Sequence, residues 1–232
     1  MASTTGPASV PQSKATTSQE DVGATPKYRL HYFNRMGRAE ARWVARLILA
    51  ASGKKWEDRR ISKEEGEAAR AAFPFKQLPA LEIVEERKVL VQANPIARYL
   101  AKELGLAGDT HWEAAVCDMV VDCLYDSLQH LVAWRSVKEK DQKDRLKKLL
   151  FEEELPRLFG ELSEMINANP AKTGFVVGTR MTWADIALAH CLDLLDALNP
   201  GCLAPYPKME MLKSKVFKVS TIEDYTRNRG RS

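Results

Sequence analysis

Tyr32 and Arg38 are the side chains of this sequence whose positions most suggest chemistry on an anion. Tyr32 lies near the end of a run from Tyr28 to Phe33 that alternates polar and apolar residues, and Arg38 follows a turn signal at Gly37. A phenol at a strand end, with a helix start and an arginine beside it, can donate to an anion such as a thiolate. A half-buried tyrosine with a solvated hydroxyl is an alternative that the residues alone leave open.

Three carboxylates, Asp118, Asp122 and Asp126, occur at i, i+4 and i+8 and therefore share one face of a predicted helix. Like charges at this spacing repel by roughly a few tenths of a kcal/mol per pair unless cations compensate. A solvated acidic face and a ligand-binding face both stay open on this evidence.

The four cysteines are Cys117, Cys123, Cys191 and Cys202, and they form no CxxC pair. Their spacing matches neither a zinc site nor a dense disulfide framework. We expect buried, inert thiols in a reducing compartment, and therefore a cytoplasmic protein. Residues 1–116 contain no cysteine, which excludes dithiol chemistry at the end of the first strand.

A small mixed sheet is predicted to position Tyr32. The hydrophobic pattern gives elements in the order βαβ, a loose segment, then ββα. The predicted segments are a strand at 28–33, a helix at 39–51, a strand at 56–61, at most a short helix at 64–72, hairpin strands at 80–84 and 88–91, and a helix at 94–104. This order is that of a thioredoxin-like domain, in which helices cover a small mixed sheet.

After Gly108 nearly every segment shows the apolar spacing of a helix. The predicted helices are 111–134, 138–167, 182–198 and 208–219. We expect a bundle of four or five helices beside the first domain. Thr182 and Asp185 form a capping box at the start of one of these helices.

Composition sets the class of protein and its domain organisation. The 232 residues are 45% hydrophobic and carry a dispersed net charge of +4, which indicates a soluble globular protein and gives no reason to expect nucleic acid. No apolar run approaches the roughly 18 residues of a membrane span. Residues 1–26 lack aromatic residues, so we predict a disordered extension there, although a transit peptide stays open. The predicted domains are 27–105 and 106–232.

Several motifs, in order and at matching spacing, resemble the sigma class of the glutathione transferase family. They are Tyr32-Phe33-Asn34 with Gly37-Arg38-Ala39-Glu40, Phe73-Pro74-Phe75 with Gln77-Leu78-Pro79-Ala80-Leu81-Glu82, Gln92-Ala93-Asn94-Pro95-Ile96-Ala97-Arg98-Tyr99-Leu100, and the three aspartates with Thr182-Trp183-Ala184-Asp185. The resemblance covers roughly residues 27 to 227. Each motif alone is weakly specific, whereas their ordered combination is strongly specific.

The resemblance implies the cytosolic glutathione transferase fold, an α/β thioredoxin-like N-terminal domain plus an all-α C-terminal domain. It implies that glutathione is a co-substrate, conjugated to hydrophobic electrophiles by a homodimer, and a prostaglandin-type isomerase activity is a further expectation. The class also includes proteins recruited as lens crystallins. A non-catalytic, ligand-binding or crystallin-like relative is therefore the alternative.

The resemblance also implies how the sulfur and the cysteinyl part of glutathione are held. It assigns the stabilisation of the thiolate to Tyr32 and places Arg38 beside it. Leu78, followed by a cis Pro79, is expected to offer its backbone to the extended tripeptide, as in the addition of a strand. An electrophile pocket is expected between the domains. Its candidate wall residues are Phe33, Met36, Leu128, Val132 and Trp134.

The two ends of glutathione are assigned by the same resemblance. Gln92 and Ala93, at the start of a helix, are expected to receive the γ-glutamyl carboxylate. Arg70 lies where the family reaches the glycyl carboxylate, and Gln77 replaces a basic or amide residue in the same loop. Asp126 is expected to cross a dimer interface to the ammonium group of glutathione in the other subunit.

Three positions depart from the family pattern. Ala93 stands where a serine is usual and lacks its hydroxyl, and a hydrogen bond to a charged group is worth ~1.5–3 kcal/mol. Asn94 can replace that hydroxyl in part. Gly66 stands where a tryptophan usually contacts glutathione. Tyr125 stands at an acidic position of the prostaglandin synthase branch, so no metal is predicted.

Overall fold

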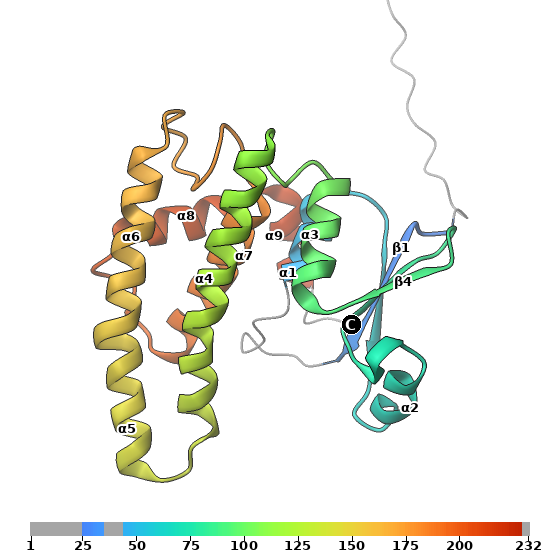
Figure 1. The fold of residues 1–232 in the computed structure, drawn as a ribbon, viewed down its shortest axis with the longest axis horizontal. Helices are drawn as coiled ribbons and strands as arrows, with labels where there is room; N and C mark the ends of the chain where they lie inside the picture. Colours follow the sequence, from blue (N-terminus) through green and yellow to red (C-terminus); the bar gives the residue numbers. More distant parts are fainter. Residues whose placement is uncertain (1–24, 35–43, 229–232) are drawn as a thin grey trace, which may run out of the picture.

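The computed structural model describes residues 25–34 and 44–228, in which a small sheet with its helices lies beside a helical domain (Figure 1). The sheet is on the right of the figure and the long helices are on the left. The extension predicted over residues 1–26 lies almost wholly outside the described residues, as do Met36 and Arg38.

Four strands form one mixed sheet in the order β2-β1-β3-β4. They are β1 (Tyr28–Phe33), β2 (Glu57–Ile61), β3 (Ala80–Ile83) and β4 (Lys88–Val91). β1 is parallel to β2 and antiparallel to β3, and β3 is antiparallel to β4. The predicted thioredoxin-like arrangement is therefore confirmed.

Helices cover both faces of this sheet. They are α1 (Val44–Ala51), α2 (Gly66–Ala71), the short 3₁₀ helix η1 (Pro74–Lys76) and α3 (Ala93–Glu103). Tyr28 and Leu30 point from alternate positions of β1 into the core that contains α1 and α3. Phe33 points to the opposite face, where it meets Gly66 and Arg70 of α2. Tyr32 points to the α1 face, as Tyr28 and Leu30 do, and it lies one residue before the end of β1.

The second domain is helical throughout its described elements. They are α4 (His111–Ser136), α5 (Lys140–Lys148), the π-helical segment η2 (Leu149–Glu154), α6 (Leu155–Ala168), α7 (Trp183–Leu198), α8 (Pro207–Phe217) and α9 (Ser220–Asn228). The regular helix predicted at 138–167 is wrong in one respect, because η2 interrupts it. Pro156 has no N–H for the carbonyl of Glu152, and a wider turn accommodates that loss. α9 is an element that the predicted helices omitted.

α7 is the centre of the helical domain, and most of its residues are buried. The predicted capping box at its start is present, since Asp185 accepts from the Thr182 backbone N–H at 2.7 Å. Asp185 also accepts from the Val176 N–H at 2.8 Å and thereby ties the preceding loop to the helix.

Side chains of α3 join the first domain to α4. Arg98 donates to Asp118 at 2.8 Å, and Asn94 donates to Asp122 at 3.4 Å. Within the second domain, the Trp183 N–H donates to the Leu106 carbonyl at 2.8 Å and ties the start of α7 to the segment after α3. In the part of the chain that the structure describes, no helix is both long and apolar enough to cross a bilayer.

Candidate active site

A cavity of about 560 Å³ lies where β1 ends and α3 begins. It is lined by Tyr32, Phe33, Arg70, Lys76, Gln77, Leu78, Pro79, Gln92, Ala93, Asn94, Pro95 and Tyr125. Every predicted glutathione-binding position except Asp126 is in this set. Among these described lining residues two are cationic and none is acidic, so the cavity favours an anionic ligand.

Tyr32 lines this cavity and is nearly buried. Its side chain is only 6% exposed, and the guanidinium carbon of Arg46 lies 5.6 Å from the centroid of its ring. Arg38, predicted as its neighbour, lies outside the described residues. A rigid phenol near a buried cation can hold an anion without reorganising.

The loop before β3 brings backbone groups to the same cavity. The Leu78–Pro79 peptide bond is cis, as the resemblance implied, and both residues are buried. Gln77, just before them, accepts a short hydrogen bond from the Gln92 side-chain amide. Two predicted binding residues that are fifteen positions apart in the sequence are therefore in direct contact.

The start of α3 forms another wall. Gln92 has a φ of 78°, an unusual conformation for a residue with a side chain, and the helix begins immediately after it at Ala93. The Asn94 side-chain amide donates to Asp122 of α4 at 3.4 Å. One N–H of the Asn94 amide is therefore directed toward α4, and its second N–H is the donor that could replace the serine hydroxyl that Ala93 lacks.

The predicted acidic face of α4 is partly neutralised from α3. Asp118 pairs with Arg98 and Asp122 with Asn94, so two of the three carboxylates link the domains. Asp126 is exposed and does not line the cavity, whereas its neighbour Tyr125 does. The role of Asp126 across a dimer interface stays a prediction.

The ring of Phe33 packs directly against Gly66. A Cβ atom added at Gly66 would lie 2.7 Å from Cε1 of Phe33, closer than such atoms pack. The phenylalanine ring therefore fills the space that a side chain at residue 66 would need. The guanidinium of Arg70 lies 5.7 Å from the same ring, so Phe33 also helps to place Arg70.

Lys76 is a cavity residue that sequence reasoning missed. It and Phe75 have φ values of 52° and 56°, a left-handed turn that brings Lys76 to the cavity and leaves Phe75 81% exposed. The one signal in the sequence was a lysine next to Gln77. Two successive positive φ angles at residues with side chains cannot be predicted from residue type.

Comparison with known proteins agrees with this geometry. The family model described as "Glutathione S-transferase, N-terminal domain" matches residues 29–102, and "Glutathione S-transferase, C-terminal domain" matches residues 125–229. Hematopoietic prostaglandin D synthase of Mus musculus is 36% identical over 197 residues, which are 85% of this chain and 94% of that protein. S-crystallin 2 of Octopus vulgaris is 30% identical over 215 residues, 88% and 97% of the two chains.

A solved structure supports the same assignment. Monomeric Na-GST-3, a glutathione S-transferase of the hookworm Necator americanus, is 28% identical with a TM-score of 0.76 and covers 87% of this chain and 97% of its own. A thioredoxin-like domain, with a cavity at the end of β1 and the start of α3 and joined to a helical domain, is the arrangement of a protein of the glutathione transferase type. The chain belongs to the glutathione S-transferase family, and the sigma-class resemblance, the enzyme class and the co-substrate glutathione are confirmed at that level.

Proposed function

We propose that this protein conjugates the thiolate of glutathione to hydrophobic electrophiles in the cavity at Tyr32. The observation that carries the proposal is the convergence of Tyr32, the Leu78 backbone, the α3 start and two cationic side chains on one cavity without an acidic residue among those that line it. A free thiol has a pKa near 8.5 and is mostly protonated at neutral pH. A donor at the sulfur therefore supplies what the reaction needs.

Each group has a separate task in this proposal. The Tyr32 hydroxyl donates to the thiolate, and the backbone of Leu78 pairs with the extended tripeptide. The Ala93 N–H at the α3 start receives one carboxylate, and the cations Arg70 and Lys76 receive the other. After attack by sulfur the electrophile carries the new C–S bond, and its leaving group departs with the electron pair of the bond that breaks.

A calorimetric titration with glutathione, followed by a conjugation assay with a general aromatic halide, tests the proposal. Saturable binding together with turnover supports a transferase. A prostaglandin endoperoxide belongs in the substrate set, because a 36% identical relative is named for that chemistry.

The second candidate is a non-catalytic, crystallin-like protein. Two observations favour it, namely the missing hydroxyl at Ala93 and the similarity to an octopus S-crystallin. Binding of glutathione without turnover on any electrophile, or no binding at all, would support this candidate over the transferase.

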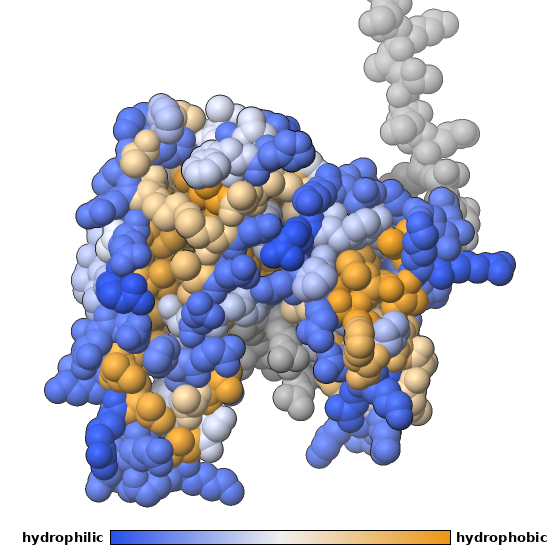
Figure 2. Space-filling view, in the orientation of Figure 1, coloured by the Kyte–Doolittle hydropathy of each residue, from blue (hydrophilic) through white to orange (hydrophobic). Residues whose placement is uncertain are grey.

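We also propose a homodimer, built on the face that carries α4 and β4. Figure 2 shows apolar side chains gathered over the sheet and along the helical domain on this side of the molecule. Trp112, Met119 and Val132 of α4 and Val89 of β4 are at least 39% exposed. Because a relative is described as monomeric, sedimentation at micromolar concentration is decisive, and a single species of 26.1 kDa would contradict the dimer.

A cytoplasmic location is proposed on the state of the thiols. Cys117, Cys123, Cys191 and Cys202 are all free, although two of them are exposed or half-buried. Free thiols of this kind persist in a reducing compartment. Fractionation of expressing cells, with the protein recovered in an oxidising compartment, would contradict this.

A further inference from the structure

A buried cluster of charges lies beside Tyr32, between the sheet and α1. Arg46 of α1 is 2% exposed, and its guanidinium carbon lies 5.6 Å from the centroid of the Tyr32 ring. A guanidinium so far removed from water is screened weakly, so its charge acts at longer range than that of a surface arginine.

One carboxylate holds two arginines in this cluster. The Arg46 Nε donates to Oδ1 of Asp58 at 2.9 Å, and the Arg60 Nε donates to Oδ2 of the same carboxylate at 3.0 Å. The side chains of Asp58 and Arg60 are 17% and 18% exposed. Counted over these three side chains alone, the formal charge is +1.

The sheet fixes this arrangement. β1 and β2 are parallel, with Leu30 opposite Asp58 and Tyr32 opposite Arg60. Residues paired in this way project to the same face, which here is the α1 face. The cluster is therefore built into the strand beside Tyr32, and no flexible loop has to place it.

We propose that Arg46, Asp58 and Arg60 are positioning residues for the reaction, which fix the Tyr32 ring and supply a net positive field that favours the thiolate form of bound glutathione. The inference rests on the proposed function and deepens it. A cation against the ring also makes the hydroxyl a stronger donor, because it draws electron density from the phenol. None of the three residues reaches the electrophile in this scheme.

Other charged and titratable groups surround the same point in the described residues. Arg70 and Lys76 line the cavity from α2 and η1, and Tyr125 lines it from α4. They face the ligand from the solvent side, whereas the Arg46 cluster faces Tyr32 from the core side. Variants of the cluster can therefore be made without touching a group that contacts glutathione.

The test uses two variants that change the net charge in opposite directions. Asp58→Asn removes one negative charge, and Arg60→Gln removes one positive charge. A unit charge about 10 Å from the sulfur, at an effective dielectric constant of roughly 20–40, moves the pKa of the thiol by roughly half a unit to one unit. We expect the acid limb of the pH profile of kcat/KM for the electrophile, measured at saturating glutathione, to move to lower pH in Asp58→Asn and to higher pH in Arg60→Gln.

Matched controls separate this effect from loss of structure. Arg59→Gln makes the same charge change on the same strand, but Arg59 is exposed and pairs with Glu65, so its profile should not move. Arg60→Lys keeps the charge and should restore the wild-type profile. Thermal unfolding of each variant is recorded, because lost stability alone would not shift two profiles in opposite directions.

The possible outcomes are distinct. Opposite shifts in the two variants, with Arg59→Gln unchanged, support the proposal. Shifts in the same direction, or none, would overturn it while the transferase stands. If calorimetry shows that the wild-type protein binds no glutathione, the proposed function has failed, and this inference fails with it. That failure is established by calorimetry alone and needs no pH profile.

Discussion

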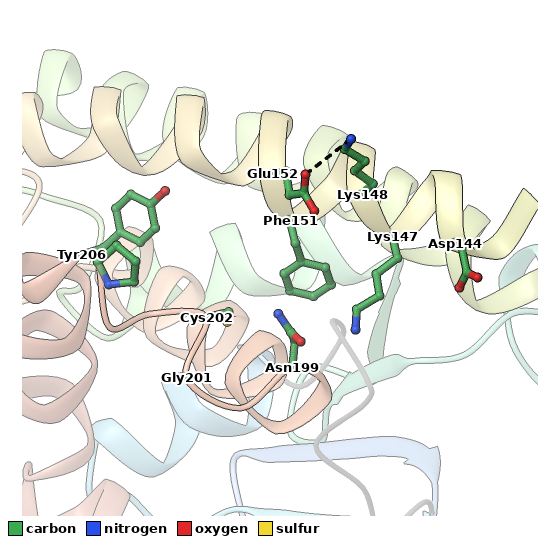
Figure 3. Close-up of a pocket in the computed structure, with 10 residues that line it drawn as sticks. Asp144, Lys147, Lys148, Phe151, Glu152, Asn199, Gly201, Cys202 and Tyr206 are labelled. Atoms are coloured by element: carbon green, nitrogen blue, oxygen red, sulfur yellow. Dashed lines mark ion pairs between the residues drawn. The ribbon is translucent and has the colours of Figure 1, made fainter. Parts of the chain in front are cut away.

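The cavity at Tyr32 and a cavity of similar size in the helical domain differ in the groups that line them. The second cavity, of about 450 Å³ against 560 Å³, lies between the α5–η2 segment and the loop from α7 to α8 (Figure 3). Phe151 and Lys147 point from the long helix toward Asn199 of that loop in the figure.

The charges of the second cavity cancel locally. Lys148 pairs with Glu152 one turn along the same helix at 3.9 Å, and Asp144 and Lys147 add one charge of each sign. Burial raises the pKa of the Cys202 thiol to about 11, and Asp196 adds to the rise, so this thiol is a poor nucleophile near neutral pH.

The cavity at Tyr32 differs because its groups converge from the ends of elements. A strand end, a helix start and a left-handed turn present groups that regular hydrogen bonding leaves available. The second cavity is walled by the side of the α5–η2 segment, whose acids and bases offset each other, and by a loop that adds no charged side chain to the lining. Volume alone therefore does not identify a site, whereas converging groups of one sign do.

The largest expected effect is that of Tyr32→Phe. Removing the hydroxyl deletes the donor to the thiolate, so turnover at neutral pH should fall at least about ten-fold, while glutathione affinity changes little because other groups hold the peptide. Steady-state kinetics and calorimetry measure the two quantities. Tyr206→Phe, which removes a hydroxyl from the second cavity, is the matched control and should leave both unchanged. A Tyr32→Phe protein as active as an active wild type would refute the assignment.

The next effect is that of Ala93→Ser. Because Ala93 has no hydroxyl and one N–H of Asn94 is directed to Asp122, a serine at residue 93 adds a donor at the α3 start. Glutathione affinity should tighten roughly ten-fold, about 1.4 kcal/mol, with thermal stability of the unliganded protein nearly unchanged. Ala68→Ser on the exposed side of α2 is the control. Equal calorimetric affinities for Ala93→Ser and wild type would mean that the helix start already satisfies the carboxylate.

Gly66→Ala should have a smaller effect of the opposite sign. The new Cβ would lie 2.7 Å from Phe33 Cε1, so the ring must move and Arg70 with it. Such crowding costs ~1 kcal/mol or more, and the KM for glutathione should rise roughly five-fold. The gain in helix propensity offsets the loss of stability. Glu67→Ala, at the next and exposed position, is the control and should leave the KM for glutathione unchanged. An unchanged KM in Gly66→Ala would mean that Phe33 has no role in placing Arg70.

Local patterns predicted much of this molecule. Alternation gave β1 and so placed Tyr32 at its end, and the capping box at Thr182 and Asp185 is present as expected. The hydrophobic periodicity of each segment and the order of the segments predicted the thioredoxin-like domain and the helical bundle. These features depend on residues close together in the sequence, where spacing carries the information.

The features that sequence reasoning missed depend on contacts between distant segments or on backbone geometry. Arg46 and Asp58 meet only because α1 packs on β2, and Phe33 meets Gly66 only across the other face of the sheet. The left-handed turn at Lys76 depends on backbone angles that residue type does not fix. Each of them refines the site, and none changes the fold.

The smallest expected effect on glutathione binding is that of changing Cys202. This residue lines the second cavity, so it tests most directly whether the two cavities differ in ligand binding. Its pKa is raised to about 11, so at any lower pH less of it is thiolate than of an ordinary cysteine. Alkylation mapped by mass spectrometry should therefore speed up roughly ten-fold per pH unit between about pH 7 and pH 10, without a plateau. Glutathione at saturation should not protect it, and Cys202→Ser should bind glutathione as wild type does. Protection by glutathione would mean that the second cavity also takes the ligand, and the distinction between converging and self-paired charges would then fail.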